Sequence, residues 1–206
     1  MIKEVIFDFD GTIADSFMTI MSLFDKHKKD LGIEDFSEKE IKIYRNEGVL
    51  ELIKKKKISI FKVSKVISKL RDESNELIAS VKPCNGIINL LEKLKEKGLV
   101  LGVMSTNGEK TINKFLENNK IEVFDYVIGQ GGLFGKDKII KGILKKRKLK
   151  SDEVLYVGDE VRDIEACRKL GIKMAAVTWG FSSKKLLEKS RPDFLVDKAE
   201  EILKLV

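Results

Sequence analysis

The sequence of 206 residues contains little cysteine, proline, histidine and arginine. Its two cysteines, Cys84 and Cys167, stand far apart and form no Cys-x-x-Cys pair. Neither a disulfide framework nor a zinc site is therefore predicted. Isolated thiols are typical of a reducing compartment, and we expect a cytoplasmic protein.

Long hydrophobic runs are also missing. No stretch approaches the roughly 18 consecutive apolar residues of a membrane-spanning helix. Charged residues at Lys3, Glu4, Asp8 and Asp10 interrupt the N-terminal apolar residues, so we expect no signal peptide. With 43% hydrophobic and 35% charged residues, the chain can bury a core beneath a solvated surface. We expect a folded protein without a membrane partner.

The formal net charge of +7 comes mainly from lysine, because 34 of the 40 basic residues are Lys and only 6 are Arg. Base recognition and bidentate phosphate contacts favour arginine, so this charge does not predict a nucleic-acid partner. A module that binds nucleic acid or anionic lipid through its basic surface is kept as the less favoured functional alternative.

Short apolar runs alternate with helical patterns along most of the chain. We predict strands at residues 2–7, Leu99–Met104, Tyr126–Ile128, Val154–Val157, Met174–Val177 and Phe194–Val196. Apolar side chains spaced along one helix face predict helices at 86–97, 109–118, 137–147, 161–170 and 199–205. This order predicts an α/β fold, a Rossmann-like parallel sheet with helices on both faces.

Residues 15–82 interrupt this alternation. No strand is evident there, whereas Ser37 and Glu40 match a capping box, and apolar positions predict a long amphipathic helix at about 60–81. We predict a small all-helical domain at 15–82, inserted after the first strand. Residues 1–14 and 83–206 would form the α/β core.

Two acidic clusters follow predicted strands. Asp8 and Asp10 end the first strand, and the two-residue period of a strand points both carboxylates to the same side. Neighbouring carboxylates repel each other unless a cation lies between them. Asp159 and Asp163 follow another strand and lie one helical turn apart. A role as helix cap would account for Asp159 but not for the whole cluster.

Two further signals follow other strands. The segment 105–108, Ser-Thr-Asn-Gly, offers a hydroxyl and backbone amides to an anionic oxygen, although these residues are also ordinary helix caps. Lys136 would begin a helix. Its surroundings do not match a nucleotide-binding P-loop, because Gln130 occupies the position of the first glycine and Asp137 that of the Ser or Thr.

In an open parallel sheet, the carboxyl ends of the strands meet at one edge, so all four signals should converge there. The resulting site would contain several carboxylates, a hydroxyl and an ammonium group. Oxygen ligands suit Mg²⁺, and a carboxylate nucleophile beside a metal is typical of phosphoryl transfer.

The four signals together resemble the motifs of the haloacid dehalogenase-like (HAD) hydrolase superfamily. Asp8-Phe9-Asp10-Gly11-Thr12 resembles its first motif, Thr106 its second, Lys136 its third and Gly158–Asp163 its fourth, in the same order and over essentially the whole chain. The segment 15–82 resembles the small helical cap of the family. Similarity to the phosphoglycolate phosphatase-like branch rests on Gly135–Ile139, Gly158–Gly171 and Trp179–Phe181.

The resemblance implies a catalytic and metal-binding role for each acidic residue. Asp8 would be the nucleophile that forms an aspartyl-phosphate, and Asp10 the general acid and then the base. Mg²⁺ would be held by the Asp8 carboxylate, the Asp10 backbone carbonyl and Asp159. Asp163 would lie outside this set and orient a metal-bound water or Lys136.

The same resemblance implies phosphate binding by Thr106 and by the amides around Asn107 and Gly108. Lys136 would screen the nucleophile from the phosphate dianion, so Thr106 and Lys136 count as both catalytic and substrate-binding residues. In the cap, Arg45 is the candidate for substrate binding. It would lie with its two neighbours in a loop over the crevice, although an ordinary helix surface fits the pattern equally well.

The resemblance also predicts the reaction. The family's dehalogenases lack the second Asp, so Asp10 favours cleavage of an oxygen–phosphorus ester. We expect a Mg²⁺-dependent phosphoric monoester hydrolase acting on a small phosphorylated metabolite, with phosphoglycolate as one candidate. A phosphosugar mutase needs the same acid and base and stays the main alternative. A monomer or a homodimer is expected, and Ser16 is expected to cap a helix.

Overall fold

The computed structural model describes residues 1–33, 36–59, 61–63, 66, 69, 73, 77, 81–105, 108–129 and 135–206. The predicted helix at about 60–81 falls largely outside these residues. Thr106 and Asn107 also lie outside them, so the structure does not test their predicted positions.

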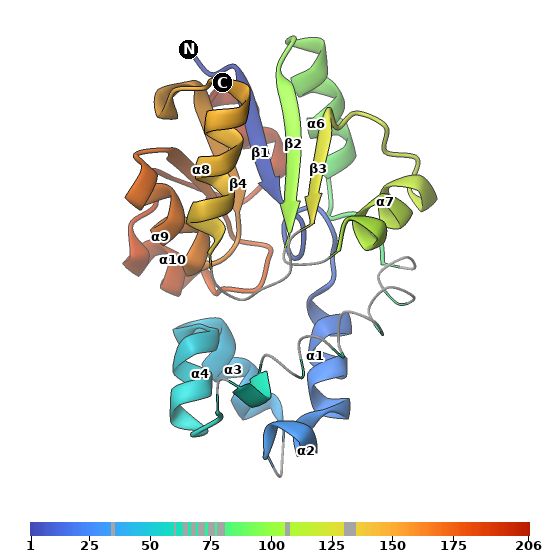
Figure 1. The fold of residues 1–206 in the computed structure, drawn as a ribbon, viewed down its shortest axis with the longest axis vertical. Helices are drawn as coiled ribbons and strands as arrows, with labels where there is room; N and C mark the ends of the chain where they lie inside the picture. Colours follow the sequence, from blue (N-terminus) through green and yellow to red (C-terminus); the bar gives the residue numbers. More distant parts are fainter. Residues whose placement is uncertain are drawn as a thin grey trace.

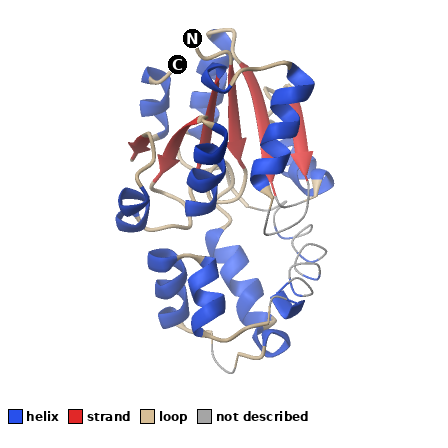
Figure 2. Ribbon diagram, turned by 60° about the vertical axis from the view of Figure 1, so that its left-hand side comes forward, coloured by secondary structure: helices blue, strands red, loops and turns tan. Residues whose placement is uncertain are grey.

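A six-stranded sheet forms the centre of the fold (Figures 1 and 2). Its strands are β1 Glu4–Asp8, β2 Val100–Ser105, β3 Tyr126–Gly129, β4 Val154–Gly158, β5 Lys173–Val177 and β6 Phe194–Val196. The spatial order is β3-β2-β1-β4-β5-β6, and all neighbouring strands are parallel. The six predicted strands are therefore confirmed. Because β1 lies between β2 and β4, its carboxyl end is at the middle of the sheet edge.

Helices cover both faces of this sheet. They are α6 Ile87–Glu96, α7 Glu109–Asn118, α8 Lys136–Arg147, α9 Val161–Leu170 and α10 Lys184–Ser190. Val5 and Phe7 of β1 pack in one apolar cluster with α6 and α7, whereas Ile6 packs in the other with α8, α9 and α10. This two-sided burial confirms the Rossmann-like fold, because successive strand residues point to opposite faces.

Two C-terminal elements differ from the expectation. The predicted helix at 199–205 is a 3-10 helix, η3 Ala199–Lys204, in which the Glu201 N–H donates to the Lys198 carbonyl. Helix α10 was not predicted, because its seven residues show too little apolar periodicity. Its start is fixed by the Ser183 hydroxyl, which accepts a hydrogen bond from the Leu186 N–H. Within the described part of the chain, no helix is long and apolar enough to cross a membrane.

The helices of the cap lie beyond the carboxyl ends of the strands (Figure 1). They are α1 Phe17–Lys26, α2 Lys28–Leu31, α3 Glu38–Glu47 and α4 Val49–Lys55, and no strand occurs among the described residues of 15–82. The predicted capping box begins α3, where the Ser37 N–H donates to the Glu40 carboxylate at 2.8 Å. We call these helices, with the described residues around them, the cap.

Two adjacent chain segments connect the cap to the sheet. The Asp15 N–H donates to the Lys82 carbonyl at 3.0 Å, and Ala14 pairs with Pro83 in an antiparallel bridge. The chain therefore leaves the sheet and returns to it at one place.

At the opposite edge of the sheet, an ion pair with a buried carboxylate fixes the start of β1. Glu4 is 1% exposed, and its carboxylate accepts hydrogen bonds from Tyr126 Oη at 2.5 Å and Arg147 Nε at 2.6 Å. The Arg147 guanidinium also lies 5.0 Å from the centre of the Tyr126 ring. Helix α8, which begins with Lys136, is thereby attached to the central strand at its far end.

Replacing Arg147 with methionine should lower the free energy of unfolding by about 2–3 kcal/mol, because it leaves the Glu4 charge buried without its ionic partner. Denaturant unfolding would measure the loss. The matched control is Lys3→Met, which removes the ion pair between the exposed Lys3 and Glu153 and should cost less than about 1 kcal/mol. Equal effects of the two substitutions would contradict the structural role of the buried pair.

Candidate active site

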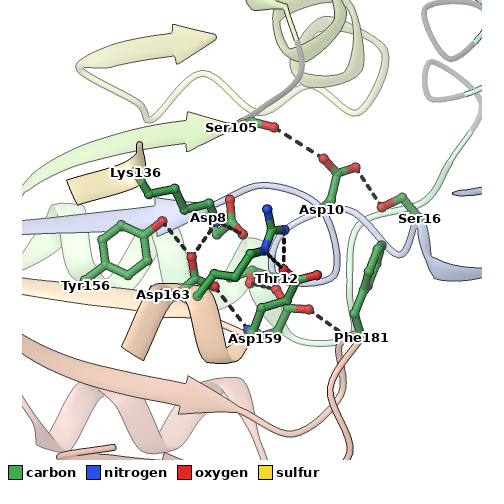
Figure 3. Close-up of polar contacts among 12 residues, drawn as sticks. Asp8, Asp10, Thr12, Ser16, Ser105, Lys136, Tyr156, Asp159, Asp163 and Phe181 are labelled. Carbon is green, nitrogen blue, oxygen red and sulfur yellow. Dashed lines mark hydrogen bonds and ion pairs between the residues drawn. The ribbon is translucent and has the colours of Figure 1, made fainter. Parts of the chain in front are cut away.

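Four charged side chains converge at the carboxyl edge of the sheet (Figure 3). Asp8 ends β1, Lys136 begins α8, Asp159 follows β4, and Asp163 lies in the first turn of α9. Each comes from a different strand end or helix start, and the parallel topology brings these together. Asp8 and Lys136 are each 6% exposed, and Asp159 and Asp163 are fully buried.

Lys136 joins two of these carboxylates. Its Nζ donates to Asp8 Oδ2 at 2.6 Å and to Asp163 Oδ1 at 2.5 Å. Burial alone would lower the pKa of Lys136, but the carboxylates of Asp163 and Asp8 outweigh it and raise that pKa above its ordinary value. Lys136 is therefore an ammonium at neutral pH, and its charge is directed at Asp8.

The Asp159 carboxylate is held on both oxygens. Thr12 Oγ1 donates to Oδ1 at 2.9 Å, and the Phe181 N–H donates to Oδ2 at 2.7 Å. Two glycines make room for it, since a Cβ on Gly11 would lie 2.4 Å from Oδ2 and one on Gly180 would lie 2.3 Å from the Asp159 Cβ. Gly11 also has a φ of +72°, which disfavours other residues. The site thus fixes the orientation of Asp159.

The Asp163 carboxylate, like that of Asp159, accepts a hydrogen bond on each of its two oxygens. Its Oδ2 accepts a hydrogen bond from the Glu160 N–H at 3.1 Å, while Oδ1 accepts the bond from Lys136. The N-cap residue of α9 is Glu160. The alternative that Asp159 serves only as a helix cap is therefore wrong, because the helix begins one residue later.

Asp10 lies in a separate polar environment. Ser16 Oγ donates to Asp10 Oδ1 at 2.8 Å, and Ser105 Oγ donates to Oδ2 at 3.3 Å. Burial raises the pKa of Asp10, and the two hydroxyl hydrogen bonds partly oppose this shift. Ser16 does occupy the N-cap position of α1, but its side chain makes no capping bond there. The expected capping role is corrected, since the hydroxyl binds Asp10 instead.

The chemistry of this cluster fits a divalent cation. One oxygen from each of Asp8, Asp159 and Asp163 lies within 4.8 Å of the others. Burial raises the pKa of Asp8 to about 7, even though Lys136 opposes the shift, and burial together with the charge of Asp8 raises the pKa of Asp159 well above its ordinary value. Buried carboxylates so close together need a cation to stay ionised, and carboxylate oxygens are ligands for hard divalent ions.

The structure places two of the predicted substrate-binding residues, Gly108 and Arg45, in different surroundings. Gly108 is the N-cap residue of α7, directly after the undescribed Thr106 and Asn107. Arg45 lies in the last turn of α3, not in a loop. Its carbonyl accepts a hydrogen bond from the Ser183 N–H at 2.7 Å.

The Arg45 side chain lies against the loop after β5. Its guanidinium is 5.0 Å from the centre of the Phe17 ring, and its Nη2 donates to the Gly180 carbonyl at 3.4 Å. The neighbours Asn46 and Glu47 are exposed and bond within the cap, to the Lys42 carbonyl and the Lys55 ammonium. For these two neighbours the helix-surface alternative is the correct one.

Sequence reasoning missed a second layer of contacts. Tyr44 Oη of the cap donates to Glu160 Oε1 at 2.7 Å, and Glu160 forms an ion pair with Arg162. Burial would raise the pKa of Glu160, but the charges of Arg162 and Lys136 and the hydrogen bonds from Tyr44 and Arg162 together outweigh it and lower that pKa. Glu160 and Arg162 lie inside the fourth motif, so the ion pair between them could have been predicted from their opposite charges. Nothing in the sequence pairs them with Tyr44.

Comparison with known proteins agrees with this geometry. Residues 5–177 match the family described as haloacid dehalogenase-like hydrolase. The chain belongs to this family. The resemblance inferred from the four motifs is therefore confirmed.

The relatives of this HAD-like hydrolase match over nearly their whole length. The chain is 27% identical to a phosphoglycolate phosphatase of Synechococcus elongatus over 99% of the chain and 97% of that protein. It is 31% identical to a phosphoglycolate phosphatase of Aquifex aeolicus, over 99% and 96%. A pyrophosphatase of Bacillus cereus is 28% identical, over 100% and 96%.

Among solved structures, a HAD-like family hydrolase from Streptococcus pneumoniae has a TM-score of 0.82. Its identity is 26%, and the match covers 99% of this chain and 98% of that one.

Proposed function

We propose that this HAD-like hydrolase is a Mg²⁺-dependent phosphatase that cleaves a small phosphomonoester through an aspartyl-phosphate on Asp8. One observation carries the proposal. The Asp8 carboxylate is buried beside two further carboxylates and contacts the Lys136 ammonium at 2.6 Å, while Asp10 is held separately by two hydroxyls. A nucleophile, a charge-screening group and a proton donor are thus present together.

In the first step, an Asp8 carboxylate oxygen attacks phosphorus and the bond to the leaving alcohol oxygen breaks. The electron pair goes to that oxygen, which takes a proton from Asp10. The raised pKa of Asp10 favours the protonated form required for this donation. In the second step, Asp10 removes a proton from water as the water oxygen attacks phosphorus. The bond to Asp8 then breaks and releases inorganic phosphate.

The Mg²⁺ ion, when bound, would neutralise the negative charge shared by the nucleophile and the phosphate oxygens. We assign it to the Asp8 carboxylate, the Asp10 backbone carbonyl and Asp159. Asp163 keeps Lys136 in place, because its Oδ1 accepts a hydrogen bond from Nζ. Lys136 screens Asp8 against the incoming dianion, which would otherwise be repelled.

We assign the remaining phosphate contacts to Thr106 and to the amides of Asn107 and Gly108. Gly108 immediately precedes α7 Glu109–Asn118, and the first amides of a helix lack partners within it, which suits an anionic oxygen. Arg45 is kept as a substrate-binding residue of the cap. Both cysteines are buried free thiols, which supports a cytoplasmic location.

The substrate class is tested by measuring free phosphate released from phosphoglycolate, pyrophosphate and a set of sugar phosphates, with and without Mg²⁺. The first two are included because relatives are named for them. Mg²⁺-dependent release from small phosphomonoesters is expected. Formation of an isomeric sugar phosphate without free phosphate would instead favour the mutase, and inactivity toward every compound would contradict the proposal.

Affinity for Mg²⁺ should rise with pH through about 7, because the proposed ligands Asp8 and Asp159 both have raised pKa values. Burial raises the pKa of Asp8 to about 7, so protons compete with the cation for this carboxylate below that pH. The apparent Kd should increase about tenfold per pH unit on the acidic side. Calorimetric titration at about pH 6 and pH 8 measures the difference. An affinity that does not change with pH would show that Asp8 and Asp159 are both already ionised without metal.

A further inference from the structure

One aromatic side chain from outside the predicted cap packs inside it. Phe181, in the loop after β5, is 5% exposed, and its ring meets the rings of Phe17 at 5.1 Å and Tyr44 at 6.1 Å between centres. Among the described residues, every other buried member of this apolar cluster lies within 15–82. The Phe181 ring is therefore an anchor between the loop and the cap.

The backbone of the same residue contacts the candidate metal site. The Phe181 N–H donates to Asp159 Oδ2 at 2.7 Å (Figure 3). Two neighbours secure the loop, since Trp179 Nε1 donates to the Thr12 carbonyl at 3.2 Å and the Ser183 N–H donates to the Arg45 carbonyl at 2.7 Å. Residues 178–183, which we call the clasp, thus contact the first motif, the fourth motif and the cap.

A second contact reinforces the same connection. Tyr44 Oη donates to the carboxylate of Glu160, the residue directly after Asp159. Moving the cap away would therefore break the Tyr44 bond and expose the Phe181 ring. Both changes would act on the chain segments that orient the Asp159 carboxylate.

We propose that the clasp couples cap closure to metal binding, with Phe181 as a positioning residue for Asp159. This proposal rests on one part of the proposed function, the assignment of Asp159 as a metal ligand. Closure buries the Phe181 ring and thereby holds its N–H on Asp159 Oδ2, which keeps the carboxylate in one orientation. Because coupling between two equilibria is reciprocal, Mg²⁺ stabilises the closed cap by the same factor by which closure strengthens Mg²⁺ binding.

The test is calorimetric titration of Mg²⁺ into the substrate-free protein. Phe181→Ala should weaken binding by about tenfold, which is typical when a group that orients a metal ligand is lost. The matched control is Phe36→Ala, which removes a ring of similar burial from the same apolar cluster, where it stacks on Phe24. Phe36→Ala should loosen packing within the cap but keep the contacts of Phe181 with Phe17 and Tyr44, so the affinity for Mg²⁺ should stay within about twofold of wild type.

A second measurement follows the cap itself. In the wild type, Mg²⁺ should slow hydrogen exchange at the Ser183 amide, which bonds to Arg45 of the cap, and this slowing should be absent in Phe181→Ala. If Phe181→Ala does not fold, Tyr44→Phe gives the same test through the bond to Glu160, with a smaller change expected. Wild-type Mg²⁺ affinity in the folded variant would overturn the coupling, as would equal weakening in Phe36→Ala.

These outcomes separate the coupling from the catalytic proposal. A wild-type protein that binds Mg²⁺ but releases no phosphate from any phosphomonoester would contradict the phosphatase and leave the clasp intact. If Phe181→Ala leaves turnover unaltered at every Mg²⁺ concentration, the coupling is contradicted and the phosphatase activity is not. If the coupling holds, Phe181→Ala should need about tenfold more Mg²⁺ for half-maximal activity and keep kcat within a few-fold at saturating Mg²⁺.

Discussion

Replacing Asp8 with asparagine should lower the rate of phosphomonoester hydrolysis by at least about three orders of magnitude. The substitution preserves the size of the side chain but removes the anionic oxygen that attacks phosphorus, so the covalent route is lost. Lys136 retains its other partner, Asp163, and should stay in place. The variant should therefore fold and lose activity through chemistry alone.

The measurement is phosphate release from p-nitrophenyl phosphate at saturating Mg²⁺, for the wild type and Asp8→Asn. Rapid quenching in acid should trap a phosphorylated wild-type protein and no phosphorylated Asp8→Asn. Equal rates in the two proteins would rule out Asp8 as the nucleophile.

Asp10→Asn is the informative control. The nucleophile remains, and p-nitrophenolate leaves without help from an acid, so phosphorylation of Asp8 should still occur. Removal of the phosphate needs a base, and the asparagine cannot accept a proton. The covalent intermediate should therefore accumulate in Asp10→Asn. Failure of both variants to form it would mean that Asp10 acts before or during the attack rather than after it.

The sheet and its charged edge were predictable because both depend on local patterns. A short apolar run indicates a buried strand, and in a parallel sheet the carboxyl ends of all strands lie at one edge. Asp8, Lys136, Asp159 and Asp163 were placed together on that argument. In the structure, their side chains do converge.

The connections between the cap and the sheet could not be predicted in this way. Tyr44 and Glu160 are 116 positions apart, and no periodicity relates a helix surface to a distant motif. Phe181 follows a strand and resembles an ordinary apolar residue, and its decisive contact with Asp159 is made by the backbone. Ser16 was misread for a related reason, because a serine before a helix usually caps it and only the fold shows Asp10 within reach.

Replacing Asp159 with asparagine should stabilise the metal-free protein and at the same time abolish its response to Mg²⁺. Asp159 is fully buried, and burial and the charge of Asp8 raise its pKa well above 3.8. A carboxyl group with a raised pKa in the folded state contributes stability at low pH, and this stability is lost as the pH rises through the folded-state value. At about pH 8, the neutral amide should make the metal-free protein about 1–2 kcal/mol more stable.

An asparagine can keep the two hydrogen bonds that hold the wild-type carboxylate. Its oxygen can accept from the Phe181 N–H, and its amide can donate to Thr12 Oγ1 after the hydroxyl rotates. The expected gain therefore corresponds to a rise in Tm of about 2–8 °C, since 1 kcal/mol shifts Tm by about 2–4 °C in a chain of this size. The gain should become small near pH 4, where the wild-type group is already protonated.

Mg²⁺ should reverse the order of the two proteins. It binds only the folded state, so it should raise the Tm of the wild type by an amount that grows with the logarithm of the Mg²⁺ concentration relative to Kd, while Asp159→Asn should bind it at least about 100-fold more weakly. Thermal unfolding at about pH 8 with and without Mg²⁺ measures both effects, and the exposed Asp152→Asn controls for the change in net charge. A metal-free Asp159→Asn less stable than the wild type would mean that the hydrogen bonds outweigh the charge repulsion. An undiminished shift with Mg²⁺ would remove Asp159 from the metal site, because the ligand that closure is proposed to orient would then contribute nothing to binding.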